Sequence, residues 1–154
     1  MQNMNIRPYA SGDWSRVCEI HDAARRHELA AAELDAAYLT LEQTAENEGF
    51  HDYEIRIAEL DGRVMGFVAF TQEELAWLYV DPAAYRQGIG TALIAAALEE
   101  TRASLTVQVL HGNQAALSLY LKNGFVVIGN DHGRMPGNET FHVSATELRH
   151  LGPA

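Results

Sequence analysis

The sequence predicts a mixed α/β fold built as one domain, residues 1–154, with its elements in the order β-α-α-β-β-β-α-β-α-β-β. A length of 154 residues suits a single domain with one sizeable core. Apolar residues alternate in some segments, as in strands, and recur every three or four positions in others, as in helices. The sequence holds no internal repeat and no linker rich in proline or glycine, which favours one continuous domain. The order differs from a doubly wound parallel sheet, where strands and helices alternate throughout.

One strand and two helices are expected in the first third of the chain. Residues 5–8 predict a short strand. Four side chains then share one helical face at the spacing i, i+3, i+4 and i+7: Trp14, Val17, Cys18 and His21. Residues 27–38 are rich in alanine but show no clear pattern. Thr40 and Gln43 match a capping box, which predicts a short second helix that ends at Gly49.

Three strands are expected next, at residues 52–59, 64–70 and 74–80. Apolar alternation predicts the first, and the dipeptide Asp61-Gly62 predicts a tight turn into the second. The third is apolar nearly throughout, as expected of a central strand covered on both faces. Two helices and three strands complete the chain: helices 91–102 and 113–122, and strands 105–109, 125–128 and 141–148. Residues 129–138, with three glycines and one proline, are expected to form a mobile loop.

Composition argues against several classes of protein. The net charge of −10 argues against a nucleic-acid partner, because phosphates are bound mainly by lysine and arginine. No apolar run approaches the length of a membrane span, and no secretory signal is expected. The single cysteine, Cys18, excludes an intrachain disulfide and favours a cytoplasmic location.

The acidic residues are unevenly placed along the chain. Ten carboxylates lie between Glu28 and Asp61, against one strong base, Arg56. Such a stretch could raise the local concentration of a cationic substrate. It could equally be an ordinary solvated acidic surface, and both interpretations stay open.

The turn at residues 85–90 carries the strongest chemical signal. A helix begins within it, so unpaired amide groups and the helix dipole would favour an anion such as a pyrophosphate. Gly88 and Gly90 lack a Cβ atom and would let a phosphate approach the backbone. Arg86 supplies a cation and Gln87 an amide donor. Alone, the spacing also fits a plain strand-to-helix turn, and it is neither a P-loop nor a dinucleotide fingerprint.

Two segments together resemble the GCN5-related N-acetyltransferase (GNAT) superfamily. The first is Leu78-Tyr-Val80-Asp-Pro82, followed by Tyr85-Arg-Gln-Gly88-Ile-Gly90. The second matches the family pattern at Asn113, Ala116, Tyr120, Lys122, Gly124 and Phe125. One position departs from the pattern: Tyr85 stands where the family has glutamine or arginine, with Arg86 one residue later. The order of elements agrees with the family along residues 5–148.

The resemblance implies a mostly antiparallel sheet with splayed central strands, flanked by helices, and acetyl-CoA as the acetyl donor. Backbone groups of Leu78 and Val80 would pair with the pantetheine arm as an added strand does. Amide groups of residues 86–91 would hold the pyrophosphate. The implied cofactor contacts are Leu78, Val80, Arg86, Gln87, Gly88, Ile89, Gly90, Thr91 and Asn113.

The resemblance also implies a catalytic role for Tyr120, as the general acid that protonates the leaving thiolate of CoA. Asn113 and Tyr120 are seven residues apart and therefore share a helical face. A phenol with a pKa of about 10 can donate to a thiolate whose free pKa is about 8.5. The alternative is a core aromatic packed beside Ala116 and Phe125.

Direct transfer also needs a group that takes the proton of the attacking amine. Glu74 begins the central strand, where the family sometimes places a carboxylate, and is the first candidate. Glu73, His21, His111 or a chain of waters are the alternatives. No pair of histidines has the spacing of metal ligands, so no metal is expected.

The sequence thus predicts an acetyl-CoA-dependent N-acetyltransferase that acts on an amine of a small, cationic acceptor. Two other functions stay open: a non-catalytic acyl-CoA-binding sensor or interaction module, and a protein N-terminal or lysine acetyltransferase. In this family the acceptor site is usually built by the first two helices and the last hairpin, here residues 27–40 and 129–140. Neither nucleic acid nor a membrane is an expected partner, whereas a homodimer stays open because family members are often dimers.

Overall fold

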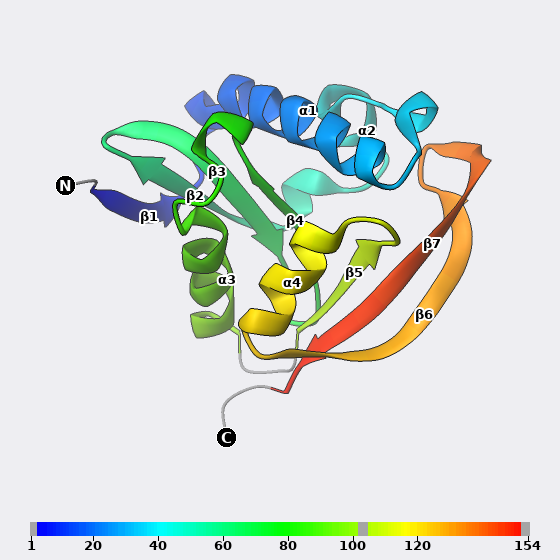
Figure 1. Ribbon diagram of the computed structural model, residues 1–154. Helices are drawn as coiled ribbons and strands as arrows, with labels where there is room; N and C mark the ends of the chain where they lie inside the picture. Colours follow the sequence, from blue (N-terminus) through cyan, green and yellow to red (C-terminus); the bar gives the residue numbers. More distant parts are fainter. Residues whose placement is uncertain (1–2, 102–104, 152–154) are drawn as a thin grey trace.

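The structure, a computed structural model, describes residues 3–101 and 105–151 (Figure 1). Its strands form two sheets, and strands that neighbour each other within a sheet are antiparallel. The first sheet has the order β1-β2-β3-β4, with β1 Met4–Pro8, β2 Glu54–Leu60, β3 Arg63–Phe70 and β4 Leu75–Val80. The second has the order β5-β7-β6, with β5 Thr106–Leu110, β6 Phe125–Met135 and β7 Asn138–His150.

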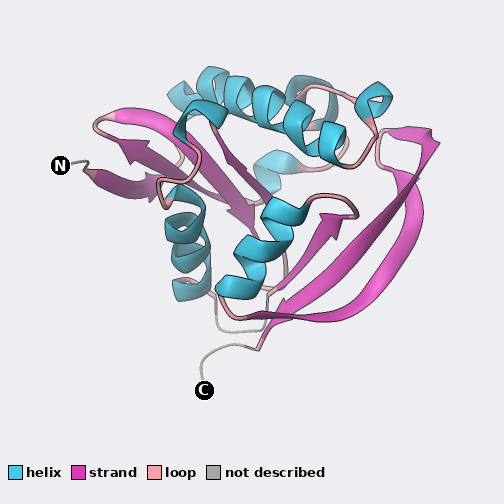
Figure 2. Cartoon of the chain, viewed as in Figure 1, coloured by secondary structure: helices cyan, strands magenta, loops and turns pink. Residues whose placement is uncertain are grey.

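The two sheets touch at one end and separate at the other. A parallel bridge pairs Glu74 with Thr106, and the Thr106 amide donates to the Glu73 carbonyl at 2.9 Å. Beyond this point β4 and β5 diverge, as Figure 2 shows. The predicted fold class is confirmed, with mostly antiparallel pairing and splayed central strands.

Helices cover both faces of the first sheet. One face is covered by α1 Trp14–Ala31 and the other by α3 Ile89–Glu99, whereas α2 Leu41–Thr44 packs against α1, and α4 Gln114–Lys122 packs against β6 of the second sheet. Side chains that alternate along a strand point to opposite faces of the sheet. Ile57 and Phe67 pack in the core under α1, whereas their neighbours Ala58 and Val68 pack in the core under α3. None of the helices described is both long and apolar enough to cross a membrane.

The first helix extends beyond the patterned part of its sequence. The alanine-rich residues that begin at His27 are helical as far as Ala31. Leu29, in this last part, is fully buried and packs with Ala37 and Met135 in a small third core. Burial against the last hairpin therefore stabilises a segment whose local pattern is weak.

Two helix boundaries differ from those predicted. The capping box is confirmed, because the Gln43 amide donates to Thr40 Oγ1 at 3.2 Å and the Thr40 amide to Gln43 Oε1 at 2.8 Å. The helix that it starts, however, lasts only one turn. The helix expected at 91–102 begins earlier, at Ile89, and its predicted end, Arg102, lies outside the described residues.

The prediction of a mobile loop at residues 129–138 is wrong. This segment forms the end of β6, the hairpin turn and the start of β7 (Figure 1). Pairing between the strands continues to Arg134, opposite His142, and after a shift of register to Met135, opposite Asn138. Buried Met135 anchors the tip, and Gly137, with a φ of 77°, makes the turn. Backbone pairing with a distant strand thus outweighs the local loop signal of the glycines.

Candidate active site

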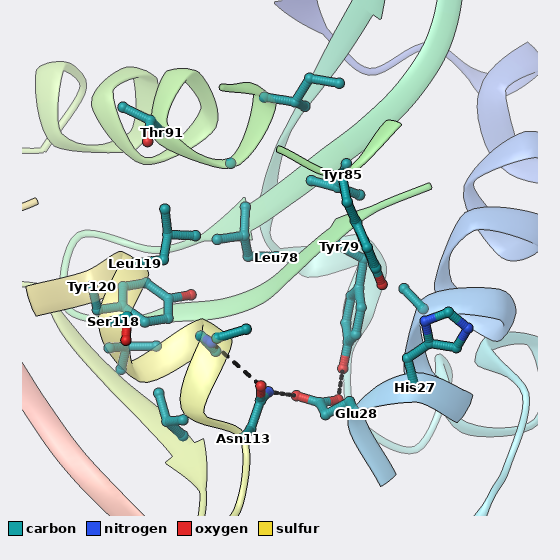
Figure 3. Close-up of a pocket in the computed structure, with 18 of the residues that line it drawn as sticks. His27, Glu28, Leu78, Tyr79, Tyr85, Thr91, Asn113, Ser118, Leu119 and Tyr120 are labelled. Carbon is teal, nitrogen blue, oxygen red and sulfur yellow. Dashed lines mark hydrogen bonds between the residues drawn. The ribbon is translucent and has the colours of Figure 1, made fainter. Parts of the chain in front are cut away.

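A cleft opens where β4 and β5 diverge. Its volume is about 670 Å³, and its walls come from α1, β4, β5, the turn before α3, α3 itself and α4 (Figure 3). Most of the predicted cofactor contacts line it: Leu78, Val80, Arg86, Gly88, Ile89, Gly90, Thr91 and Asn113. Gln87 does not line the cleft, and its buried Oε1 has no hydrogen-bond partner among the described residues. The fold therefore brings the two family-like segments to one place.

The glycines of the turn before α3 have different roles. Gly88 is the N-cap of α3 with a φ of 81°, and a Cβ there would meet no atom within 4 Å. Glycine is thus required at this position for its conformation, and the helix start stays open to an anion. Gly90 lies close to α4, because a Cβ there would lie 2.9 Å from Leu119 Cδ2, the end of a flexible side chain that would have to shift. Gly90 also lines the cleft, so its role as a cofactor contact stays a prediction.

Tyr85, the departure from the family pattern, lies at the edge of the cleft. Its ring packs edge-on against His27 of α1, with the ring centroids 5.9 Å apart (Figure 3). Next to it, Arg86 has a φ of 66° and lines the cleft. The cation at this turn therefore comes from Arg86, while Tyr85 joins the turn to α1.

Tyr120 is both a core aromatic and a cleft residue. Its ring packs edge-on against Phe125 at a centroid distance of 5.2 Å, and the residue is only 4% exposed. It also lines the cleft, where its hydroxyl points toward Leu78 on β4 (Figure 3). Burial, with a further contribution from the negative charge of Glu28, raises the pKa of Tyr120 far above its usual value. The phenol therefore stays protonated, and its hydroxyl is able to donate a hydrogen bond.

Asn113 begins α4 and ties it to α1. Its Oδ1 accepts a hydrogen bond of 3.3 Å from the Ala116 amide, which makes it the N-cap of the helix. Its Nδ2 donates to Glu28 Oε2 at 3.4 Å (Figure 3). The side chain predicted to contact the cofactor is thus held in place from two sides.

A second cavity of about 530 Å³ lies on the other side of the gap between β4 and β5. Residues of α1, β4, β5 and the tip of the β6–β7 hairpin form its walls. The two cavities share six lining residues: Glu28, Leu75, Ala76, Tyr79, Val107 and Gln108. They therefore border each other at the gap between the splayed strands.

Two of the predicted base candidates line this second cavity. Glu74 accepts a 2.5 Å hydrogen bond from the Tyr53 hydroxyl, which raises the pKa of Tyr53 to about 12. His21 is buried and lies 2.9 Å from Asp22 through its Nδ1. Burial lowers the pKa of His21, although Asp22 opposes the shift, so the ring is neutral at neutral pH.

The other two candidates lie elsewhere. His111 lines neither cavity, and its Nε2 contacts Asn130 Oδ1 at 3.1 Å on the second sheet. Glu73 also lines neither cavity, and its carbonyl accepts the Thr106 amide where the sheets meet. Their places in the fold do not favour either residue as the base.

Sequence reasoning missed Glu28, which lines both cavities. Its Oε1 accepts hydrogen bonds from the Tyr79 hydroxyl at 2.8 Å and from Arg25 Nη1 at 2.5 Å. Figure 3 shows the carboxylate between Tyr79 and Asn113. One signal could have found it: the helical stripe that includes His21 continues to Glu28, seven residues on.

The second cavity carries more negative than positive charge. Four carboxylates line it: Glu28, Glu48, Glu74 and Glu147. Arg25 also lines it but is paired with Glu28. Of the ten carboxylates between Glu28 and Asp61, Glu28 and Glu48 reach a cavity, and burial raises the pKa of Glu48. Within residues 3–101 and 105–151, no group of three or more histidine, cysteine or acidic side chains could hold a metal ion.

Comparison with known proteins gives consistent matches. A profile of the acetyltransferase (GNAT) domain matches residues 51–127. The uncharacterized N-acetyltransferase YhfO of Bacillus subtilis (strain 168) is 30% identical over 136 residues, covering 79% of this chain and 89% of YhfO. A GCN5-related N-acetyltransferase structure from Rhodopseudomonas palustris has a TM-score of 0.78 at 22% identity, over 96% of this chain and 94% of that one. The structure of yncA from Salmonella typhimurium, with its cofactor acetyl-CoA, has a TM-score of 0.70 at 22% identity. The match covers 99% of this chain and 98% of that one.

These matches place the chain in one class of enzyme, the N-acetyltransferases that use acetyl-CoA as donor. Within that class the chain belongs to the acetyltransferase (GNAT) family. The predicted family, fold, donor and type of enzyme are therefore confirmed.

Proposed function

We propose that the protein moves the acetyl group of acetyl-CoA directly to an amine of a small, cationic acceptor. One observation carries this proposal: two cavities meet in the gap between β4 and β5. The first is lined by the glycine turn and Tyr120, and the second by four carboxylates. Donor and acceptor would therefore enter from opposite sides and meet between the strands.

The first cavity suits the donor. The backbone of Leu78 and Val80 is available to the pantetheine arm, because β5 has diverged from this part of β4. The amides at the start of α3 and the guanidinium of Arg86 would hold the pyrophosphate. Gly88 has no side chain, and no atom lies within 4 Å of the position that a Cβ atom would take there. This leaves room for the pyrophosphate.

Tyr120 and Glu74 are the proposed catalytic residues. As the amine nitrogen bonds to the thioester carbon, the carbon–sulfur bond breaks and its electron pair passes to sulfur. Tyr120 would hydrogen-bond to that sulfur and protonate it as the thiolate leaves, and its raised pKa keeps the hydroxyl protonated until then. Glu74 lines the cavity from which the amine arrives and would take the amine proton, directly or through water.

The second cavity supports a small, positively charged acceptor. Glu48, Glu74 and Glu147 line it, and none of them forms an ion pair with a described residue. A cationic ligand would therefore be favoured over a neutral one of the same shape. Met135 and Pro136, at the tip of the last hairpin, form part of the wall and limit the size of the acceptor.

A CoA-release assay against a graded panel of amines tests the proposal. The panel should compare a diamine, a monoamine and an amino acid of equal chain length, with the acetylated product identified by mass spectrometry. We expect the diamine to have the highest kcat/KM, by roughly tenfold over the monoamine, because its second charge meets a carboxylate. A preference for the amino acid would contradict the proposal that the acceptor is cationic. Absence of turnover with every amine would contradict the proposed acetyl transfer.

We also propose that the protein works in the cytoplasm. Cys18 is half-buried and unpaired, which is typical of a reducing compartment. Fractionation of cells that express the protein tests this location, and recovery in an oxidising compartment would contradict it.

A further inference from the structure

Glu28 occupies the junction between the two cavities. It lines both of them, whereas Tyr120 lines only the first and Glu74 only the second. Its side chain is 21% exposed, so the carboxylate is partly open to the gap. A group placed here contacts whatever passes between the donor and acceptor sides.

The two oxygens of Glu28 are unequally occupied. Oε1 accepts two hydrogen bonds, from the Tyr79 hydroxyl at 2.8 Å and from Arg25 Nη1 at 2.5 Å. Oε2 has one partner in the described part of the chain, Asn113 Nδ2 at the long distance of 3.4 Å. Because a carboxylate can accept about four hydrogen bonds, Oε2 has room for a further donor. Tyr79 and Arg25 hold the group in place while Oε2 stays open.

We propose that Glu28 binds the reacting nitrogen of the acceptor, an inference that rests on the proposed function. An N–H of the incoming amine donates to Oε2, which holds the nitrogen at the gap and turns its lone pair toward the donor side. The same carboxylate positions Asn113, which lines the donor cavity. One residue of α1 thus fixes the acceptor relative to the donor.

The surroundings of Glu28 support binding of a positively charged or strongly donating group. Its negative charge reaches Tyr120, Tyr79 and Tyr85, and helps to raise the pKa of each of them. These three tyrosines all line the donor cavity. The charge of Glu28 is therefore felt across the cleft and not only by its partner Arg25.

Kinetics of the variant Glu28→Gln test the inference with the acceptor that the amine panel identifies. Glutamine keeps the size of the side chain and an oxygen for Tyr79, but loses the charge. We expect the KM for the acceptor to rise by about tenfold or more, as for a lost bond to a charged group. The Kd for acetyl-CoA, measured by calorimetry, should stay within about twofold, since the pyrophosphate turn is untouched and Asn113 is still held by the Ala116 amide.

A double variant separates binding of the amine from simple neutralisation of Arg25. In Arg25→Gln/Glu28→Gln both charges of the pair are removed. If Glu28 only neutralises Arg25, the double variant regains the wild-type KM; if Glu28 binds the amine, the KM stays high. The matched control is Glu19→Gln, an exposed acid of the same helix that lines neither cavity and should leave the KM unchanged.

The outcomes are distinct. Wild-type turnover with an unchanged KM in Glu28→Gln, or recovery in the double variant, overturns the inference and leaves the proposed function standing. Absence of turnover in the wild type with every amine overturns both. A high KM in both variants, with intact acetyl-CoA binding, supports the inference.

Discussion

The hydroxyl of Tyr79 donates a 2.8 Å hydrogen bond to Glu28 Oε1 and thereby joins β4 to α1 at the junction of the two cavities. Burial, followed by the negative charge of Glu28, raises the pKa of Tyr79 well above its usual value, so the hydroxyl stays a donor. The strand that would carry the pantetheine arm and the helix that borders the acceptor side are therefore held together by a bond to a charged group.

Tyr79→Phe should lower the free energy of unfolding by about 1.5–3 kcal/mol, because it leaves a partly buried carboxylate with one donor fewer. Chemical denaturation monitored by circular dichroism measures this. Tyr53→Phe is the matched control: it removes a similar hydroxyl–carboxylate bond in an exposed setting and should cost less. Equal losses of stability in the two variants would contradict the claim that burial strengthens the bond between Tyr79 and Glu28.

Tyr120→Phe should reduce kcat by roughly a hundredfold or more, since the leaving thiolate loses its hydrogen-bond donor. The ring still fills its place against Phe125, so thermal stability and the Kd for acetyl-CoA should change little. CoA-release assays and calorimetry measure the two effects separately. Full activity in this variant would remove Tyr120 from the catalytic step.

The two glycines of the turn should respond differently to alanine. Gly88→Ala forces a side chain into the left-handed region at a φ of 81° and should cost about 1–2 kcal/mol of stability. Gly90→Ala instead places a methyl group against the end of the Leu119 side chain, and Leu119→Val, which shortens that side chain, should relieve the contact. A double-mutant cycle measures the coupling. We expect coupling between positions 90 and 119 and none between 88 and 119; the reverse would refute the roles of the two glycines.

His21 should make stability depend on pH. Its pKa is lowered in the folded protein, so the unfolded chain binds a proton more readily below about pH 6.5. The contribution of neutral His21 to the free energy of unfolding is therefore complete above about pH 6.5. It is lost as the pH falls through the lowered pKa of His21 in the folded protein. The Tm of the wild type should fall from neutral to mildly acidic pH, and His21→Gln should weaken that fall. The exposed His142→Gln should keep the wild-type slope; an equal slope in all three proteins would contradict the prediction.

Much of the fold can be predicted because its signals are local. The capping box at Thr40 and the turn at Asp61-Gly62 depend on neighbours in the sequence and lie where the pattern indicates. Residues 129–138 escape such prediction because their glycines and proline suggest a loop. What makes them strands is pairing with residues of β7 and burial of Met135 against α1 residues more than a hundred positions earlier, as in its contact with Arg25.

The site divides in the same way. The glycine turn and the helix that carries Asn113 and Tyr120 each consist of consecutive residues, so a sequence pattern can identify each of them. Glu28 is 51 residues from Tyr79 and 85 from Asn113, and no local pattern encodes contacts over such separations. The acceptor cavity, built from these distant pieces, is consequently the part that the sequence could not define.

A crystal structure of the protein with CoA tests the central claim most directly. The quantity to measure is the distance between the sulfur of CoA and the hydroxyl oxygen of Tyr120. We expect the sulfur in the gap between β4 and β5, within hydrogen-bond reach of that hydroxyl, and the pyrophosphate at the start of α3. A CoA molecule bound elsewhere, or with its sulfur out of reach of Tyr120, would contradict the proposed mechanism.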